Sequence, residues 1–262
     1  MSRIKDYFVN LYLEIRLWLH FKLKFRIWRR VFTNFTTLYP TPQSFLVEWR
    51  TGMPWGRVHP DYDHQIMTQS SVSEFYEEIR LSHLPFADEY IFPDGERKGE
   101  KVYPSIDCGV IYYGAPFKYG VFQISCILPL SDYAWPAFWL TGKDSWPPEI
   151  DWFEFMPKRI NEKGRYLLST NIHSNKAERS YGYRINEDIM DKEITFTGVW
   201  EKEYISFYYN GILIRKITNK KVIKAMDQEM ILVIGTGASS DYERNIHYSN
   251  FKIKRVLYSR YV

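Results

Sequence analysis

Short runs of strand-forming residues, each closed by a cluster of turn residues, fill most of the chain from residue 41 to residue 262. Residues 204–209 and 212–217 are two such runs, and Asn210-Gly211 joins them. Asn-Gly adopts the positive φ angles of a type I′ turn, so the segment predicts a β-hairpin. Other strands are predicted at 119–128, 134–140, 149–155, 167–173 and 250–258. This pattern is typical of an all-β sandwich.

The composition supports a large core for one such domain. Hydrophobic residues make up 45% of the 262 positions and aromatic residues 18%, which excludes disorder for most of the length. The chain has only two cysteines, Cys108 and Cys126, too few for a disulfide framework or a zinc site. A single disulfide bond between Cys108 and Cys126 is the alternative to two free thiols. A helix is one interpretation of residues 71–81.

Residues 1–40 differ from the rest, so we predict a basic amphipathic extension followed by one domain at 41–262. Helical spacing of apolar residues over 4–19 and strict alternation over 20–27 predict a helix and then a strand. Residues 1–30 hold eight Lys or Arg and two acids, a charge of +6, and the whole chain carries +4, so the remainder is near −2. The main domain is therefore not expected to bind nucleic acid, and duplex binding is conceivable only for residues 1–30.

The extension also bears on location. The longest charge-free stretch near the N-terminus, residues 7–13, is far shorter than the roughly 20 residues of a membrane span. No small-residue cleavage site follows it, so the sequence predicts neither a span nor a cleavable signal, and localisation stays open. For the basic segment we favour packing on the domain or contact with a protein partner over contact with an anionic membrane.

Three carboxylates stand in the pattern E-x-D-x-x-E within WPPEIDWFEF, residues 146–155. On a regular strand Glu149 and Asp151 share one face and Glu154 points to the other. One extra residue in a β-bulge returns Glu154 to the face of the other two acids. The core side would then receive Ile150 and one of Trp152 or Phe153.

Three acids on one open face allow glycoside chemistry. The outer Cα atoms would be about 13 Å apart, and glutamates leaning inward close most of that gap. A retaining glycosidase needs its carboxyl groups about 5–5.5 Å apart and an inverting one about 6.5–9.5 Å, and the spacing permits the retaining case. Neighbouring like charges push pKa values apart, which lets one carboxyl ionise while another keeps its proton. The alternative is an acidic strand edge that only limits aggregation.

The segments around these acids resemble glycoside hydrolase family 16. The signature of that family is a strand of the type yGxFExRxKLP, then WPAFWL, then E-x-D-x-x-E, and this chain has the three in the same order. Later strands are similar in order and spacing, and the resemblance covers roughly residues 45–262. The matching segments are YGVFQISCILPL (119–130), WPAFWL (135–140), EIDWFEF (149–155), NIHSN (171–175), YYNGIL (208–213) and FKIKRVLY (251–258).

The resemblance implies a jelly-roll, concanavalin A-like sandwich with the substrate across its concave sheet. It implies an endo-acting, retaining hydrolase with Glu149 as nucleophile, Glu154 as acid/base and Asp151 orienting both. The six-residue spacing resembles the bulged branch, so a β-1,3-glucan or a related β-galactan is the expected polysaccharide. No cofactor is needed and no calcium loop is recognisable, so no metal is expected.

Six further residues are predicted to contact the substrate. Trp135 and Trp139 share one strand face, where an indole either stacks on a sugar or packs in the core. His173 resembles a family histidine near the middle carboxylate, where it would hold Asp151. The full set is Trp55, Trp135, Trp139, Trp146, Asn171 and His173.

Two departures from the family pattern affect substrate identity. Gln123 stands where that strand usually carries Glu, which would remove a charge from the cleft region. Residues 230–237 lack an expected Asn. The alternative functions are a non-catalytic carbohydrate-binding protein and a transglycosylase on the same fold.

Overall fold

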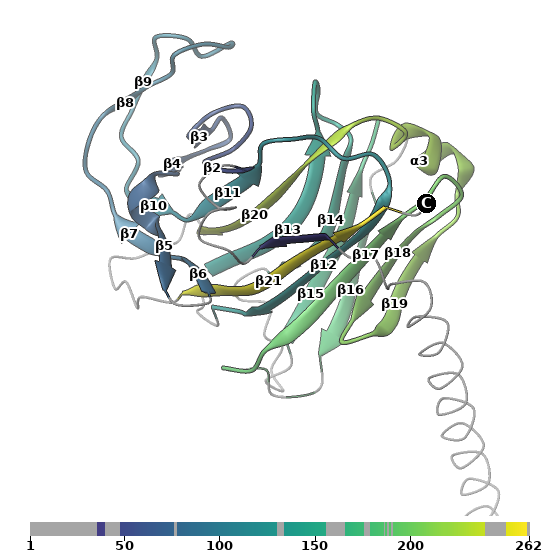
Figure 1. Cartoon of the computed structure of the whole chain (residues 1–262). Helices are drawn as coiled ribbons and strands as arrows, with labels where there is room; N and C mark the ends of the chain where they lie inside the picture. Colours follow the sequence, from purple (N-terminus) through teal and green to yellow (C-terminus); the bar gives the residue numbers. More distant parts are fainter. Residues whose placement is uncertain are drawn as a thin grey trace, which may run out of the picture. The chain divides into compact units, whose positions relative to one another are not determined.

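Two large β-sheets face each other in the computed structural model of this chain (Figure 1). The structure describes residues 36–39, 48–75, 78–129, 134–155, 166–175, 179–185, 187, 189, 191–238 and 250–260. The helix and strand predicted within 4–27 lie outside these residues. The division of the chain at residue 40 therefore stays a prediction.

The seven-stranded sheet carries the acidic strand in its middle. Its order is β16-β15-β14-β13-β20-β11-β2. The strands are β2 (Trp49–Thr51), β11 (Val110–Tyr113), β13 (Ala134–Gly142), β14 (Glu149–Phe155), β15 (Tyr166–His173), β16 (Arg179–Ile185) and β20 (Met230–Ala238).

The eight-stranded sheet covers one face of the first. Its order is β19-β18-β17-β12-β21-β6-β5, and β1 also pairs with β21. The strands are β1 (Thr36–Tyr39), β5 (Val72–Phe75), β6 (Glu78–Leu81), β12 (Gly120–Ile127), β17 (Ile194–Trp200), β18 (Ile205–Tyr209), β19 (Ile212–Ile217) and β21 (Phe251–Ser259).

Smaller elements flank the sandwich. A four-stranded sheet has the order β3-β4-β10-β7, and β8 and β9 form a separate pair. Figure 1 shows β8 and β9 projecting beyond β3 and β4. The elements are β3 (Val58–His59), β4 (Tyr62–Ile66), β7 (His83–Pro85), β8 (Tyr90–Ile91), β9 (Lys101–Val102), β10 (Ile106–Cys108), the 3₁₀ turn η1 (Gln69–Ser71) and the helix α3 (Lys220–Ala225).

The core between the large sheets is aromatic, and β14 contributes to it directly. Phe153 stacks on Phe196 of β17 with ring centroids 4.0 Å apart. Trp152 lies over Gly198 of the same strand, where an added Cβ would stand only 2.2 Å from the indole. Only glycine leaves enough room at that position, so β17 is shaped to receive the side chain of the acidic strand.

The predicted sandwich strands are confirmed, within one or two residues at their ends. Asn210 and Gly211 have φ angles of 45° and 78°, as the predicted hairpin turn requires. The possible helix at 71–81 is wrong. There the 3₁₀ turn η1 leads into β5 and β6, and β6 pairs with β21. Ile79 and Leu81 alternate along β6 and are both buried in the core, which favours a strand over a helix.

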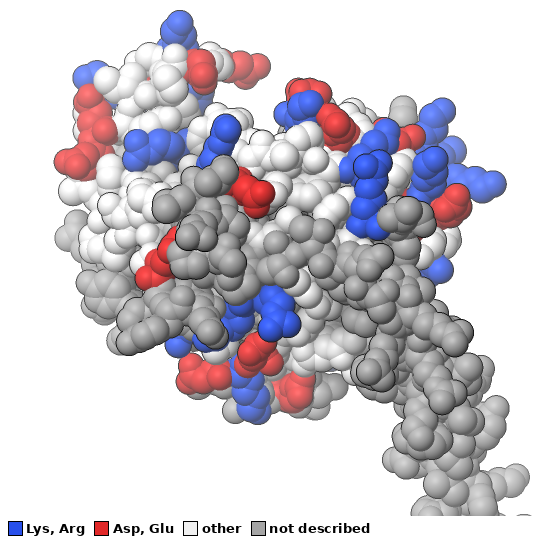
Figure 2. Space-filling model, viewed as in Figure 1, with Lys and Arg blue, Asp and Glu red and all other residues white. Residues whose placement is uncertain are grey.

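The two cysteines do not form a bridge. Cys108 and Cys126 are both free and buried, and they belong to different apolar clusters. On the face seen in Figure 2, described basic side chains gather at the upper right, near α3, and acidic ones lie among them and elsewhere on this face. No helix among the described residues has the length and apolar character needed to cross a membrane.

Candidate active site

A bulge in β14 brings its three acids to one face, as the sequence predicts. Asp151 lies opposite Asn171 of β15 and Glu154 lies opposite Ser169, so two residues on β14, Trp152 and Phe153, face the single Thr170 on β15. The pairing of β14 with β13 shifts at the same place. One additional residue reverses the side on which every later side chain emerges, which turns Glu154 toward Glu149 and Asp151.

One detail of the predicted bulge is wrong. We expected Ile150 and only one of Trp152 or Phe153 to face the core, but all three are buried there. Trp152 packs against Phe122 and Phe207 of the opposite sheet. The extra residue of the bulge lets two consecutive side chains point inward, because the strand bends locally.

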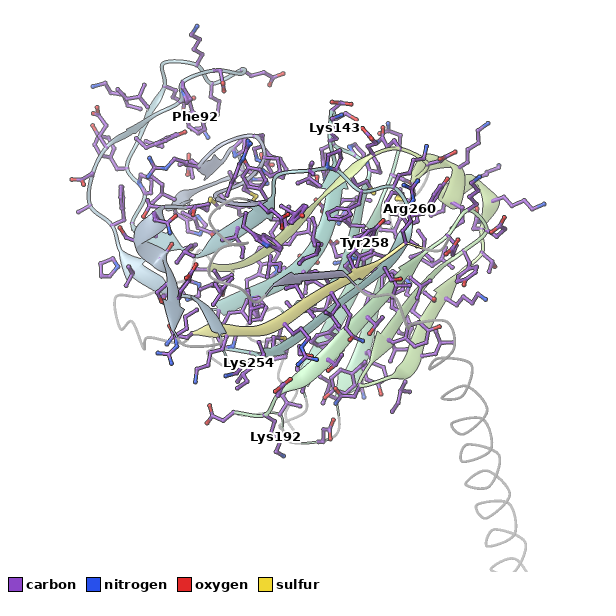
Figure 3. The ribbon with its side chains drawn as sticks, in the orientation of Figure 1. Phe92, Lys143, Lys192, Lys254, Tyr258 and Arg260 are labelled. Atoms are coloured by element: carbon purple, nitrogen blue, oxygen red, sulfur yellow. The ribbon has the colours of Figure 1, made fainter. Side chains whose placement is uncertain are left out.

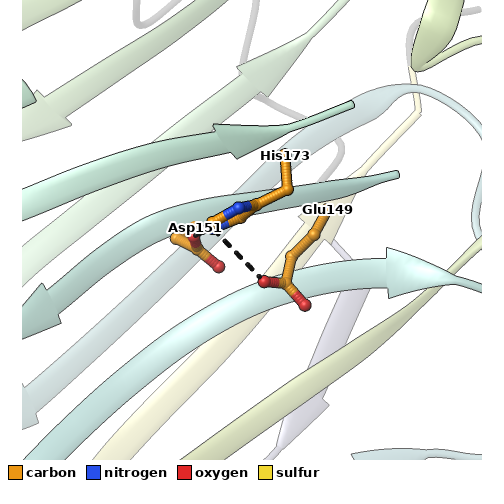
Figure 4. A group of neighbouring side chains, drawn as sticks. All are labelled: Glu149, Asp151 and His173. Atoms are coloured by element: carbon orange, nitrogen blue, oxygen red, sulfur yellow. Dashed lines mark ion pairs between the residues drawn. The ribbon is translucent and has the colours of Figure 1, made fainter. Parts of the chain in front are cut away.

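His173 joins two of the acids. Its Nε2 lies 3.3 Å from Oδ2 of Asp151 and 3.6 Å from Oε1 of Glu149. Figure 4 shows the three side chains converging from two neighbouring strands. Ligand atoms of the three residues lie within 4.8 Å of one another, close enough to hold a small cation. The expectation that the protein needs no metal stays a prediction.

Glu154 has its own hydrogen-bond donors. Trp135 Nε1 donates to Oε1 of Glu154 at 3.0 Å. The amide nitrogen of Asn171 donates to Oε2 of the same carboxyl. Two N–H groups from β13 and β15, the neighbours of β14 on either side, therefore fix the orientation of this carboxyl.

Burial dominates the electrostatics of Glu149. Loss of solvent, followed by the nearby charge of Asp151, raises the pKa of Glu149 well above its ordinary value. The charge of His173 and a hydrogen bond from Trp146 act in the opposite direction. His173 and Trp146 therefore favour the ionised form of this carboxyl against an environment that disfavours it.

Asp151 is the most deeply buried of the three acids, with 2% of its surface exposed. Burial, and then the charge of Glu154, raises the pKa of Asp151. A hydrogen bond from Asn171 and the charge of Arg215 lower it. A middle carboxyl that keeps its proton removes one negative charge from between the two glutamates.

The predicted substrate-binding residues fall into different settings. Trp146 is exposed, and its ring centroid lies 5.8 Å from that of His173. Asn171 and Trp135 contact Glu154 directly. Trp139 is only 8% exposed and packs in an apolar cluster with Met67, so its ring offers little surface to a sugar. Contact of these side chains with substrate stays a prediction.

Sequence reasoning missed two residues near the acids. Tyr62 of β4 packs edge-to-face on Trp135 with centroids 5.7 Å apart. Arg215 of β19 donates to the side chain of Thr170 at 2.9 Å and acts electrostatically on Asp151. For Tyr62 no pattern pointed to the site. For Arg215 the available signal was a pair of charged residues, Arg215 and Lys216, inside the strand Ile212–Ile217.

The two departures from the family pattern have different consequences. Gln123 does not lie in the cleft region, which corrects our expectation. It is on β12 of the eight-stranded sheet and donates to Thr197 of the adjacent strand at 2.9 Å, while its neighbours Phe122 and Ile124 fill the core. In 230–237, Val233 is buried beside Trp139, which makes this part of the sheet face apolar.

Paired carboxylates on an open sheet face are the arrangement of a glycoside-cleaving site. The family model "Glycosyl hydrolases family 16" matches residues 98–252, more than half of the chain. The chain therefore belongs to glycosyl hydrolases family 16, and its fold is the jelly-roll sandwich that its structural neighbours share.

Similar proteins include a curated relative and solved structures. The endo-1,3-1,4-beta-glycanase ExsH of Rhizobium meliloti (strain 1021) is 29% identical over 101 residues, which are 37% of this chain and 21% of ExsH. The match thus spans about a fifth of that relative. A laminarinase from Flavobacterium sp. UMI-01 superposes with a TM-score of 0.63 at 18% identity, over 81% of this chain and 93% of that one.

A second structural neighbour has a different named substrate. The kappa-carrageenase from Pseudoalteromonas carrageenovora, solved with an oligotetrasaccharide of kappa-carrageenan, superposes with a TM-score of 0.59 at 14% identity. The superposition covers 86% of this chain and 92% of that one. At such identities the two structures establish the fold that this chain shares with them.

Proposed function

We propose that this protein is an endo-acting, retaining glycosidase that cleaves a β-linked polysaccharide. The observation that carries the proposal is the bulge between Asp151 and Glu154. It puts two glutamates and one aspartate on the same face, with different partners for each glutamate. Two carboxyls in unlike environments are what a double displacement requires.

In the proposed mechanism, Glu149 attacks the anomeric carbon while Glu154 gives its proton to the leaving oxygen. Glu154 then takes a proton from water, and the water releases the sugar from Glu149 with the original anomeric configuration. Asp151, protonated and close to His173, limits the repulsion between the glutamates. Trp135 and Asn171 keep Glu154 in position during both steps.

A β-1,3-glucan or mixed β-1,3-1,4-glucan is the first substrate we propose, and a related β-galactan the second. The name of the curated relative and that of the laminarinase neighbour support the glucan. The name of the carrageenase neighbour supports the galactan as the alternative substrate. A transglycosylase would use the same glutamates and differ in its products.

The test is a reducing-end assay on laminarin, mixed-linkage glucan, agarose, carrageenan and porphyran. We expect the wild type to act on at least one polymer and Glu149→Gln to lose at least about 10³-fold in rate. Glu74→Gln, at an exposed glutamate of the eight-stranded sheet, is the matched control and should keep full activity. Wild-type inactivity on every polymer, combined with retained binding, would instead support a non-catalytic carbohydrate-binding protein.

A further inference from the structure

A positive charge lies behind the acidic strand, on the core side of the sandwich. Side chains fill the space between the two large sheets (Figure 3), and a large apolar cluster occupies it. Arg215 of β19 lies opposite Phe207 of β18, so the two side chains emerge on the same face of the eight-stranded sheet. Phe207 is buried in the core, and the guanidinium carbon of Arg215 lies 5.2 Å from its ring centroid. A charge beside an apolar core is costly unless polar partners compensate for the lost water.

The guanidinium of Arg215 finds such partners on the seven-stranded sheet. Its Nη1 donates to the side-chain oxygen of Thr170 at 2.9 Å and also to the backbone oxygen of that residue. Thr170 is fully buried and alternates along β15 with the core residues Leu168 and Ile172 on the same face. The ring centroid of Tyr181, which pairs with Thr170 from β16, lies 5.9 Å from the guanidinium carbon. One side chain of β19 thus connects the two sheets.

Thr170 is the residue that lies across from the bulge of β14. Trp152 and Phe153 both face it, whereas the residues of β15 on either side of it keep single partners. An extra residue in one strand disrupts the hydrogen-bond ladder locally, so backbone groups at that place need other partners. Arg215 supplies a charged donor to the backbone oxygen of Thr170 at this position.

The same arginine acts on β14 in two other ways. Phe207, which adjoins the guanidinium, packs against Trp152 of the bulge with ring centroids 5.4 Å apart. Burial is the largest influence on the pKa of Asp151 and raises it, and the charge of Arg215 acts in the opposite direction. The guanidinium therefore contacts both sides of the bulge and is felt by the middle acid.

We propose that Arg215 is a positioning residue that fixes the bulge of the acidic strand from the core side. The inference rests on the proposed function and deepens it. Without the bulge, Glu154 would turn to the opposite face of β14, away from the other two acids. By holding Thr170 and Phe207 in place, Arg215 stabilises the arrangement in which the three acids share one face. It acts from behind the sheet and does not contact the reacting atoms.

The first experiment compares Arg215→Met with Lys216→Met, which removes the neighbouring charge of the same strand. Lys216 is exposed and lies 4.2 Å from the ring centroid of Tyr204, so it is the matched control. We expect kcat of Arg215→Met on the preferred polymer to fall about 10- to 100-fold with a small change in KM, because a misplacement of about 1 Å costs up to about 10²-fold in rate. Lys216→Met should keep the wild-type kcat.

Two milder variants separate positioning from a general loss of stability. A single nitrogen of Arg215 makes both hydrogen bonds to Thr170, so the ammonium group of Arg215→Lys can replace it and should recover most of the lost kcat. Thr170→Val removes one acceptor at nearly the same shape and should lower kcat roughly fivefold, the effect of one hydrogen bond. It provides the test if Arg215→Met does not fold.

All rates are measured well below the lowest Tm of the set, where every variant compared is folded. A merely structural contact would lower the Tm and leave kcat per folded molecule unchanged, and that result would overturn the inference.

Amide hydrogen exchange distinguishes this inference from the proposed function. In Arg215→Met, or in Thr170→Val if the first variant does not fold, the amides of 151–154 and 169–171 should exchange at least about tenfold faster, while those of β13 and β20 keep their rates. Unchanged exchange at the bulge would overturn the positioning role. Faster exchange there, in a protein that never shows turnover, would retain that role and reject the hydrolase. Turnover that Arg215→Met leaves unaltered would do the reverse.

Discussion

The indole nitrogen of Trp135 lies 3.0 Å from Oε1 of Glu154, so a residue of the WPAFWL strand holds the proposed acid/base directly. Trp135→Phe keeps an aromatic ring and removes this donor. We expect kcat to fall roughly 10- to 150-fold with a smaller change in KM, because the loss of one hydrogen bond to a charged group is worth about 1.5–3 kcal/mol. Steady-state kinetics on the preferred polymer provide the measurement. An unchanged kcat would show that Asn171 alone positions Glu154.

The pH dependence of activity follows from the raised pKa of Glu149. A nucleophile must be ionised, and burial keeps this carboxyl protonated to a higher pH than its ordinary value of 4.5. Activity should therefore decline as the pH falls through the raised value, and the acidic limb of kcat/KM should lie above 4.5.

The same profile tests the role of His173. Its charge lowers the pKa of Glu149, so His173→Gln should move the acidic limb to higher pH. Half-buried His64 contacts the backbone oxygen of Ala238 and none of the three acids, and it serves as the control through His64→Gln. If the acidic limb of kcat/KM lies at the same pH in His173→Gln as in the wild type, the proposed electrostatic contact is ruled out.

The acids should weaken the fold at neutral pH. A carboxyl whose pKa is raised on folding contributes its stability below the pKa of the unfolded chain, and that contribution is lost as the pH rises toward and through the folded value. Glu149→Gln should therefore raise the Tm at pH 7 by about 2–4 °C, the shift expected for about 1 kcal/mol in a domain of this size. At a pH below 4 the gain should vanish. Calorimetry at both pH values checks the sign.

Gly198 should not tolerate a larger side chain. An added Cβ would stand 2.2 Å from the indole of Trp152, so Gly198→Ala must displace the acidic strand or β17. We expect a destabilisation of about 1–3 kcal/mol together with reduced turnover. Denaturant unfolding and the reducing-end assay measure the two effects. A variant with normal stability and normal turnover would mean that the core relaxes around the new methyl group.

Divalent metal ions should inhibit polysaccharide cleavage, and none should be required for it. Chelation with EDTA is expected to leave turnover unchanged, because the double displacement needs only side-chain groups. Zn²⁺ should inhibit, since Glu149, Asp151 and His173 present ligand atoms within 4.8 Å of one another. His173→Gln should weaken that inhibition. Loss of activity on chelation would contradict the proposed mechanism.

The sequence predicted the elements whose evidence is local. Alternation and the Asn210-Gly211 pair identified strands, and the parity of Glu149, Asp151 and Glu154 predicted a bulge. Features that depend on distant parts of the chain were missed, such as Tyr62 against Trp135 and Arg215 near Asp151. Strand alternation shows which side chains share a face, but it does not assign a strand to one of two sheets. This is why Gln123 was misplaced.

The bulge in β14 limits the insertions and deletions that this strand can accept. Its acids are interleaved with Ile150, Trp152 and Phe153, which are all anchored in the core. Insertion or deletion of one residue between Asp151 and Glu154 would rotate an acid away from its partners and expel an aromatic ring from the core in the same event. The spacing of the acids and the stability of the core therefore depend on the same residues of β14. Substitutions outside this strand can alter substrate contacts without changing either.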